Sequence, residues 1–180
     1  SDHLVRSYRH TFDMPITLSN CSNNYGPYQF PEKLLPLMII NGMEGRSLPI
    51  YGDGKNVRDW LYVTDHCDAI WQIVCRGQVG ETYNIGGNSE KANIDVVNGI
   101  CSILDDLFPA AENQLLNGKI SEYAELITFV TDRAGHDRRY AINFDKINSQ
   151  LGWKPKMNFH DGLKRTIEWY AENRDWVAHI

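Results

Sequence analysis

Apolar positions along the chain recur with two different periods, and these periods predict the secondary structure. Leu4, Val5, Tyr8 and Phe12 recur at helical spacing, which predicts an amphipathic helix over residues 1–12. The same criteria predict further helices over residues 32–41, 64–77, 93–108, 145–152 and from 160 onward, and extended segments at 15–20, 47–50, 56–63, 81–85 and 127–130. Because helical and extended segments alternate, the pattern is typical of an α/β protein.

Three predicted helices begin with side chains that could accept hydrogen bonds from free backbone N–H groups. Thr64 is a candidate N-cap for one helix, Asn93 or Asp95 for the next, and Asp145 for a third. Gly152 is expected to end the helix that Asp145 begins.

Two further expectations concern how the helices pack. In the helix after Thr64, the inner face is expected to carry Ala69, Ile70, Ile73 and Val74. In the helix predicted at 32–41, Pro36 must either kink the helix or mark its true first turn.

The chain does not contain enough regular strands for a complete sheet. Residues 15–20, 81–85 and 127–130 are predicted as strands, and residues 110–124 as a polar surface excursion. Three strands are too few for a doubly wound sheet, and the first helix has no preceding strand to pack on. We therefore expect this chain to be the later part of a longer protein.

Composition limits the class of protein further. The 180 residues contain 42% hydrophobic residues and five Trp, which indicates a globular domain with a substantial core. A formal charge of −5 argues against nucleic acid as the main partner. No apolar run approaches the roughly 20 residues needed to cross a membrane.

The cysteines give no sign of a metal or redox site. No pair has C-x-x-C spacing, so reduced thiols in a cytoplasmic protein are the simplest interpretation, and no metal is implied. Cys21 has no assignable base partner, so a nucleophilic role is not expected.

A polar loop follows the first predicted strand. Residues 20–27, Asn-Cys-Ser-Asn-Asn-Tyr-Gly-Pro, come between that strand and Glu-Lys-Leu-Leu-Pro at 32–36. Ligands of open α/β sheets bind beyond the carboxyl ends of the strands, so this loop is a candidate site. Taken alone, it could equally be a plain turn rich in Ser, Asn, Gly and Pro.

Four later segments favour a binding site over a plain turn. They are Pro-Ile-Tyr-Gly-Asp-Gly at 49–54, Arg-Asp-Trp-Leu-Tyr-Val-Thr-Asp-His at 58–66, Tyr-Asn-Ile-Gly-Gly at 83–87 and Asp-Arg-Ala-Gly-His-Asp-Arg-Arg-Tyr at 132–140. With the polar loop, and in this order, they resemble the C-terminal half of the dTDP-glucose 4,6-dehydratases, which are extended short-chain dehydrogenases/reductases. The resemblance runs from Ser1 to about Trp176.

The resemblance implies a fold, a cofactor and a reaction. It implies a Rossmann-type NAD-binding protein, a dTDP-sugar substrate, a homodimer in the full-length enzyme, and no nucleic acid, membrane or metal partner. The family oxidises the sugar at C4 with NAD, eliminates water across C5 and C6, and returns the hydride to C6. It further implies that residues 1–20, 51–88 and 155–176 are trailing Rossmann segments, and that residues 21–50 and 89–154 form the substrate-binding domain.

The family pattern also assigns site residues. Arg58 and Arg133 match positions at the nucleotide diphosphate, and an Arg side chain offers a fork of donors that suits phosphate. Asn24 matches the position nearest the nicotinamide of NAD. The complete predicted substrate-binding set is Asn23, Lys33, Leu34, Pro49, Ile50, Tyr51, Arg58, Asn93, Asp132, Arg133, Ala134, Gly135 and His136.

Several of these assignments have simpler alternatives. Arg58 could form a structural ion pair with Asp59 or a neighbour, and Lys33 could be a solvated surface charge. Tyr51 could be core, and Asn93 could be only a helix cap. At Ala134 the family more often has Pro, a difference that removes no functional group.

The chemistry of the reaction is not expected in these residues. No G-x-G-x-x-G is present, and the resemblance places the catalytic Tyr-x-x-x-Lys and the acidic pair upstream of Ser1. Tyr51 and Lys55 match that spacing, but the two intervening glycines would cost a helix about 2 kcal/mol. His66 beside Asp65 is expected to be structural.

Two other functions remain open at this point. One is another NAD-dependent sugar-nucleotide epimerase or dehydratase, and the other is a non-catalytic module that binds nucleotide sugars. An upstream Tyr-x-x-x-Lys would distinguish the enzymes from the binding module.

Overall fold

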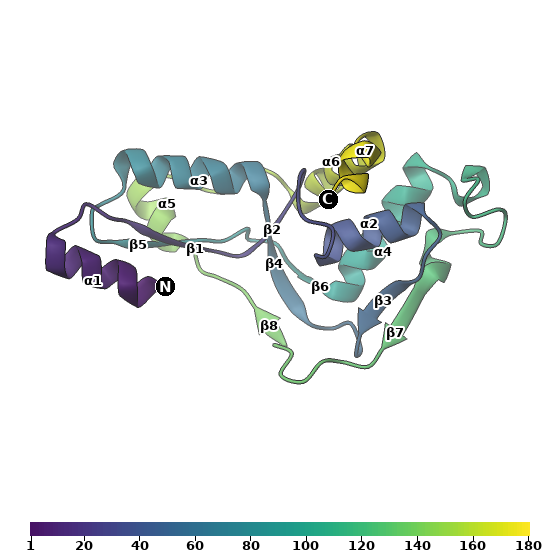
Figure 1. Ribbon diagram of the computed structural model, residues 1–180, viewed down its shortest axis with the longest axis horizontal. Helices are drawn as coiled ribbons and strands as arrows, with labels where there is room; N and C mark the ends of the chain where they lie inside the picture. The colour runs from purple at the N-terminus through teal and green to yellow at the C-terminus, as the bar shows by residue number, and fades with distance from the viewer.

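The computed structural model describes residues 1–180 and contains helices and strands in alternation (Figure 1). The α-helices are α1 (Asp2–Phe12), α2 (Leu34–Met43), α3 (Val63–Arg76), α4 (Asn93–Leu107), α5 (Asp145–Leu151), α6 (Phe159–Glu172) and α7 (Arg174–Ala178). The strands are β1 (Leu18–Cys21), β2 (Asn23–Tyr25), β3 (Leu48–Tyr51), β4 (Val57–Tyr62), β5 (Thr82–Ile85), β6 (Glu90–Ala92), β7 (Ile127–Val130) and β8 (Arg139–Tyr140). The α/β prediction is confirmed.

The molecule is elongated, with a separate core towards each end (Figure 1). At one end, β1 and β5 pair in parallel, with α3 and α5 on one side of the pair and α1 on the other. Leu61, Ile73, Ile85 and Trp153 belong to the core of this end. At the other end, α2, α4 and α6 pack together over a larger core of 22 buried residues.

Strand β4 runs between the two ends and organises the middle of the molecule. It pairs in parallel with β2 and β8 and antiparallel with β6. β3 and β7 form a separate parallel pair with Leu48 opposite Ile127. The eight strands thus form three sheets, and the expectation of three regular strands was wrong.

The missed strands are short and polar. β2 reads Asn-Asn-Tyr and β6 reads Glu-Lys-Ala, so neither shows an apolar alternation. Part of the predicted polar loop is therefore a strand, held by pairing with β4 rather than by its own composition.

The predicted helix caps are also wrong. α3 begins at Val63 with Tyr62 as N-cap, α4 has Ala92 as N-cap, and α5 has Phe144 as N-cap, each without a side-chain cap hydrogen bond. Thr64, Asn93, Asp95 and Asp145 all lie inside their helices. Buried Asp65 uses Oδ2 to accept from the backbone N–H groups of Lys156 and Met157, which fixes the segment before α6.

Helix α3 buries less than its sequence pattern predicts. Ala69 and Ile73 are buried, but Ile70 and Val74 are exposed, together with Trp71. The sheet beneath α3 at this end has only two strands, so it covers a narrow stripe of the helix.

Other expectations are confirmed. Pro36 lies in the first turn of α2, where its missing N–H breaks no hydrogen bond. β7 has the predicted bounds, and Gly152 ends α5 in the left-handed conformation. Residues 110–124 are largely irregular and include the short 3₁₀ helix Ala110–Glu112. None of the helices is both long and apolar enough to span a membrane.

We expect the isolated chain to associate through α1. This helix buries none of its residues, and Leu4 and Phe12 are 64% and 65% exposed. β1 also has a free edge, since it pairs only with β5. A contiguous exposed apolar face of this kind promotes association.

Light scattering and binding of an apolar dye check this prediction. The double substitution Tyr8→Glu, Phe12→Glu should reduce both signals, whereas Thr11→Glu adds one charge to the same helix and should reduce them less. A parent chain that stays monomeric at high concentration and binds no dye would contradict the prediction.

Candidate functional site

A cavity of about 450 Å³ lies where the β4 strand, the start of α2 and the segment before β8 meet. Its lining residues come from six separate stretches of sequence. They are Asn23, Glu32, Lys33, Leu34, Leu37, Met38, Pro49, Tyr51, Arg58, Trp60, Asn93, Arg133 and His136. Most of the residues predicted from the sequence are thus brought together.

Arg58 supplies a buried positive charge to this cavity. Its side chain donates to the backbone carbonyls of Val57 (2.7 Å) and Asp137 (2.8 Å), and the residue is 9% exposed. The alternative of an ion pair with Asp59 is wrong. Asp59 instead accepts from the backbone N–H groups of Gly87 (2.8 Å) and Ser89 (2.7 Å). Arg58 therefore has no carboxylate partner.

The segment from Asp132 to His136 forms another wall. Asp132 Oδ1 lies 2.7 Å from His136 Nδ1 and accepts from the backbone N–H of Arg133 at 2.9 Å. The hydrogen bond with His136 holds the pKa of Asp132 below its usual range. These contacts fix the backbone of the segment and leave the exposed Arg133 side chain without an ion-pair partner.

The turn after β3 lies against the same segment. The φ of Gly52 is +58°, which favours glycine, and a Cβ at this position would lie 3.0 Å from Asp132 Oδ2. Tyr51 packs edge-on against His136 with ring centroids 6.5 Å apart. Tyr51 is half exposed, so the alternative that it belongs to the core is wrong.

The wall at the start of α2 carries one positive and one negative side chain, Lys33 and Glu32, just before the helix. Lys33 is the N-cap residue of α2, and its Nζ lies 2.6 Å from Glu32 Oε1. Both side chains are about 60% exposed, so this ion pair holds Lys33 only weakly. Lys33 remains able to turn towards an anion in the cavity.

Some buried polar atoms around the site lack a partner. They are Asn93 Oδ1, Trp60 Nε1 and Asn24 Oδ1. Asn24 does not line the cavity. Its Nδ2 donates to Cys21 Sγ at 3.2 Å and to the carbonyl of Ser22 at 3.1 Å. Burial raises the pKa of the Cys21 thiol, which disfavours the nucleophilic thiolate.

Not every predicted residue lines the cavity. Pro49 and Tyr51 do, but Ile50 between them is buried in the core, as the period of a strand requires. Asp132, Ala134 and Gly135 shape the loop without facing the cavity.

Four residues that were not predicted from the sequence also line the cavity: Glu32, Leu37, Met38 and Trp60. Two spacings could have revealed three of them. Trp60 follows Arg58 by two residues on the same strand, and Leu37 and Met38 follow Leu34 by about one helical turn.

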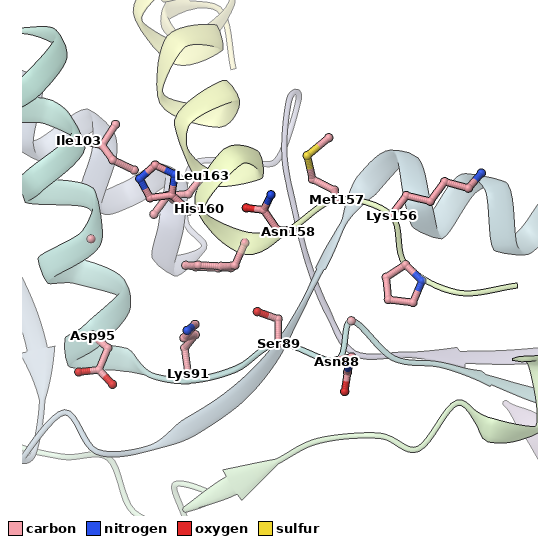
Figure 2. Close-up of a pocket in the computed structure, with 14 residues that line it drawn as sticks. Asn88, Ser89, Lys91, Asp95, Ile103, Lys156, Met157, Asn158, His160 and Leu163 are labelled. Carbon is pink, nitrogen blue, oxygen red and sulfur yellow. The ribbon is translucent and has the colours of Figure 1, made fainter.

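A second cavity, of about 570 Å³, lies between α4 and the start of α6 (Figure 2). Its charged lining groups are the exposed side chains of Lys91, Asp95 and Lys156, and the exposed His160 also lines it. Figure 2 shows the Lys156 side chain directed away from the other labelled side chains. None of the residues predicted from the sequence lines this larger cavity, and its lining has no buried charge comparable to Arg58.

Two residue pairs that resemble catalytic pairs in the sequence, Tyr51 with Lys55 and Asp65 with His66, do not form catalytic arrangements. Tyr51 ends β3, and Gly52 and Gly54 have φ values of +58° and +70°, so Tyr51 and Lys55 do not share a helix. Burial lowers the pKa of His66, and its neighbour Asp65 binds backbone N–H groups instead. No cluster of His, Cys, Asp and Glu side chains is arranged to hold a metal ion.

Comparisons with known proteins give consistent results. The family model described as GDP-mannose 4,6 dehydratase matches residues 1–166. A dTDP-glucose 4,6-dehydratase of Escherichia coli is 55% identical over 180 residues, which are 100% of this chain and 47% of that protein. One from Neisseria meningitidis is 53% identical, over 49% of its length. The chain thus spans about half the length of these curated relatives.

Solved structures show the same fold. A dTDP-glucose 4,6-dehydratase from Bacillus anthracis, in complex with NAD, superposes with a TM-score of 0.84 at 47% identity. The match covers 99% of this chain and 51% of the Bacillus anthracis protein. A UDP-glucose 4-epimerase from Thermotoga maritima superposes with a TM-score of 0.82 at 23% identity. That match covers 96% of this chain and 51% of the epimerase. At such low identity it shows only that the two proteins share a fold.

Proposed function

The chain belongs to the GDP-mannose 4,6 dehydratase family, and on this basis we propose that it is the substrate-binding part of a dTDP-glucose 4,6-dehydratase. The observation that carries the proposal is Arg58, a buried guanidinium on a cavity wall with no carboxylate partner. A buried, unpaired positive charge is costly unless a ligand supplies the negative charge.

The geometry supports a nucleoside diphosphate sugar as the ligand. Arg58 and Arg133 approach from β4 and from the segment before β8, and Lys33 lies at the start of α2, where the positive helix end also favours an anion. Tyr51, Leu37 and Met38 provide an aromatic and apolar surface for a base. Asn23 and Asn93 provide amides for hydroxyl groups.

The proposed reaction converts dTDP-glucose to dTDP-4-keto-6-deoxyglucose and water. When bound, NAD supplies the hydride acceptor for oxidation at C4 and the hydride donor for C6. From this chain, Asn24 fits beside the nicotinamide, because its buried Oδ1 lacks a hydrogen-bond donor. This chain's role is to bind and orient the sugar nucleotide.

The proposal includes the arrangement of the whole protein. We assign residues 1–20, 51–88 and 155–176 to a Rossmann domain, and residues 21–50 and 89–154 to the substrate-binding domain. The exposed apolar face of α1 suits a homodimer of the full-length enzyme. The four free cysteines suit a cytoplasmic location.

We expect the 180-residue chain to bind dTDP but to produce no 4-keto sugar from dTDP-glucose, even with added NAD. The diphosphate contacts lie in this chain, whereas a dinucleotide-binding glycine motif and a helical Tyr-x-x-x-Lys do not. Titration calorimetry with dTDP, UDP and GDP measures the binding and the base preference.

The two measurements test different parts of the proposal. Failure of dTDP to bind, or equal binding of GDP, would reject the assigned substrate. Turnover of dTDP-glucose by the purified chain would show that the catalytic groups are present here after all.

A further inference from the structure

The backbone carbonyl of Asp137 accepts two hydrogen bonds from strand β4 and its approach. One comes from Asn56 Nδ2 at 3.1 Å and the other from Arg58 at 2.8 Å. Asp137 directly follows the loop that carries Arg133 and His136. Two buried side chains therefore hold the end of this loop at a single point.

Asn56 also connects this loop to a second wall of the cavity. Its backbone carbonyl accepts from the N–H of Asn93 at 3.0 Å, at the first residue of α4. The next residue, Val57, donates its N–H to the carbonyl of Arg138 at 2.8 Å. Asn56 is thus placed between the loop and the start of α4, although it does not line the cavity.

The ion pair made by this loop end is exposed, unlike its hydrogen bonds with Asn56 and Arg58. Arg138 pairs with Asp53 at 2.9 Å, and both side chains are more than half exposed, so solvent weakens that pair. Asn56, in contrast, is 3% exposed. A hydrogen bond made there is protected from competition by water.

We infer that Asn56 is a positioning residue, which fixes residues 132–137 so that Arg133 and His136 face the cavity. The part of this inference that concerns dTDP binding rests on the proposed function, because there Asn56 acts on the nucleotide through Arg133. The part that concerns the conformation of the loop does not depend on any ligand.

Asn56 has a feature that separates this role from a general contribution to stability. Its Oδ1 is buried and accepts no hydrogen bond. Asn56→Leu keeps the branched shape, removes the unpartnered oxygen and removes the donor to Asp137. Stability should therefore change little, while the Asp137 carbonyl loses one of its two donors.

The first test is limited trypsin digestion of the free chain, followed by mass spectrometry. For Asn56→Leu and Asn56→Ala we expect cleavage after Arg133 to rise about fivefold, the change that corresponds to loss of one hydrogen bond. Cleavage after Arg165, inside α6, reports global unfolding and should stay at the parent rate in Asn56→Leu.

Asn41→Leu is the matched control. Asn41 is also buried, donates to one backbone carbonyl, that of Ser47 at 3.0 Å, and has an unpartnered Oδ1. It does not contact the loop, so cleavage after Arg133 should stay at the parent rate. Unchanged cleavage after Arg133 in both Asn56 variants would overturn the inference.

The second test is a double-mutant cycle on dTDP affinity. Asn56→Leu should weaken binding about fivefold in the parent but less than about twofold in Arg133→Ala, because the group that it positions is then absent. Equal losses in both backgrounds would overturn the coupling to Arg133. If the parent does not bind dTDP, the proposed function fails, and the digestion result alone decides the role of Asn56 in the loop.

Discussion

Replacing Gly87 by alanine is expected to destabilise the chain by about 4 kcal/mol or more, the range reserved for severe changes in a core. A Cβ at this position would lie 1.9 Å from the carbonyl oxygen of Trp60 and 2.9 Å from the backbone N of Leu61. These atoms belong to β4, which is buried and pairs with β2, β6 and β8. They cannot move aside as a flexible side chain would.

The contacts of Gly87 itself prevent it from moving away. Its N–H donates to Asp59 Oδ2 at 2.8 Å and to Ser22 Oγ at 3.2 Å, and both partners are buried. A shift of the turn would leave the Asp59 carboxylate without one of its donors. Leaving such a charged group unsatisfied is costly, so either response to the added methyl group destabilises the fold.

Denaturant unfolding followed by tryptophan fluorescence measures this effect. Gly99→Ala is the matched control, because its Cβ would meet only Leu163 Cδ2, at 3.5 Å, an ordinary contact. Since Gly99 lies within α4, alanine should there be neutral or stabilise by up to about 1 kcal/mol. A Gly87→Ala chain as stable as Gly99→Ala would show that the turn after β5 can relax.

Long elements with a clear apolar period could be predicted from the sequence. The α1 pattern of Leu4, Val5, Tyr8 and Phe12 gave the correct helix because helical spacing persisted over several turns. β2 and β6 could not be predicted, since they are polar and exist through pairing with β4, a partner distant in sequence. The predicted caps failed because α3 and α4 begin directly after strands β4 and β6, so the last strand residues, Tyr62 and Ala92, occupy the N-cap positions.

In the candidate site, too, local features could be predicted from the sequence and long-range features could not. Residue chemistry alone made Arg58 and Arg133 candidates for binding phosphate, and their assignment to the diphosphate came from the family resemblance. Neither the chemistry nor the spacing showed that the two residues would share one cavity. That follows from the parallel pairing of β4 with β8, in which Arg58 lies opposite Tyr140. The family resemblance supplied this long-range information. The cavity-lining face of β3 could have been predicted from strand alternation, which places Pro49 and Tyr51 on one face and Ile50 on the buried face.

Arg133→Ala is expected to weaken dTDP binding by about 10- to 150-fold without lowering the melting temperature. A charge-assisted hydrogen bond to a phosphate contributes about 1.5–3 kcal/mol, and each 1.4 kcal/mol is a factor of ten. The Arg133 side chain is exposed and makes no ion pair, so its removal breaks no ion pair within the protein.

Arg58→Ala should give a similar loss of dTDP affinity with a different effect on stability. Its guanidinium also donates to the carbonyls of Val57 and Asp137, and the alanine variant leaves those buried groups without these donors. The melting temperature should therefore fall together with the affinity. In a longer protein that contains this chain, much of the loss should appear in KM, if the diphosphate is held equally in the ground and transition states.

Titration calorimetry with dTDP, together with thermal unfolding of each variant, distinguishes a ligand-binding arginine from a purely structural one. Arg138→Ala is the matched control, because this residue lies in the same segment but does not line the cavity, and it loses only an exposed ion pair with Asp53. It should bind dTDP like the parent, since such pairs contribute little. If Arg133→Ala binds dTDP as tightly as Arg138→Ala does, Arg133 does not contact the diphosphate. If Arg58→Ala loses stability but keeps its dTDP affinity, the role of Arg58 is only to hold Asp137, and the anion in the cavity must be bound by other groups.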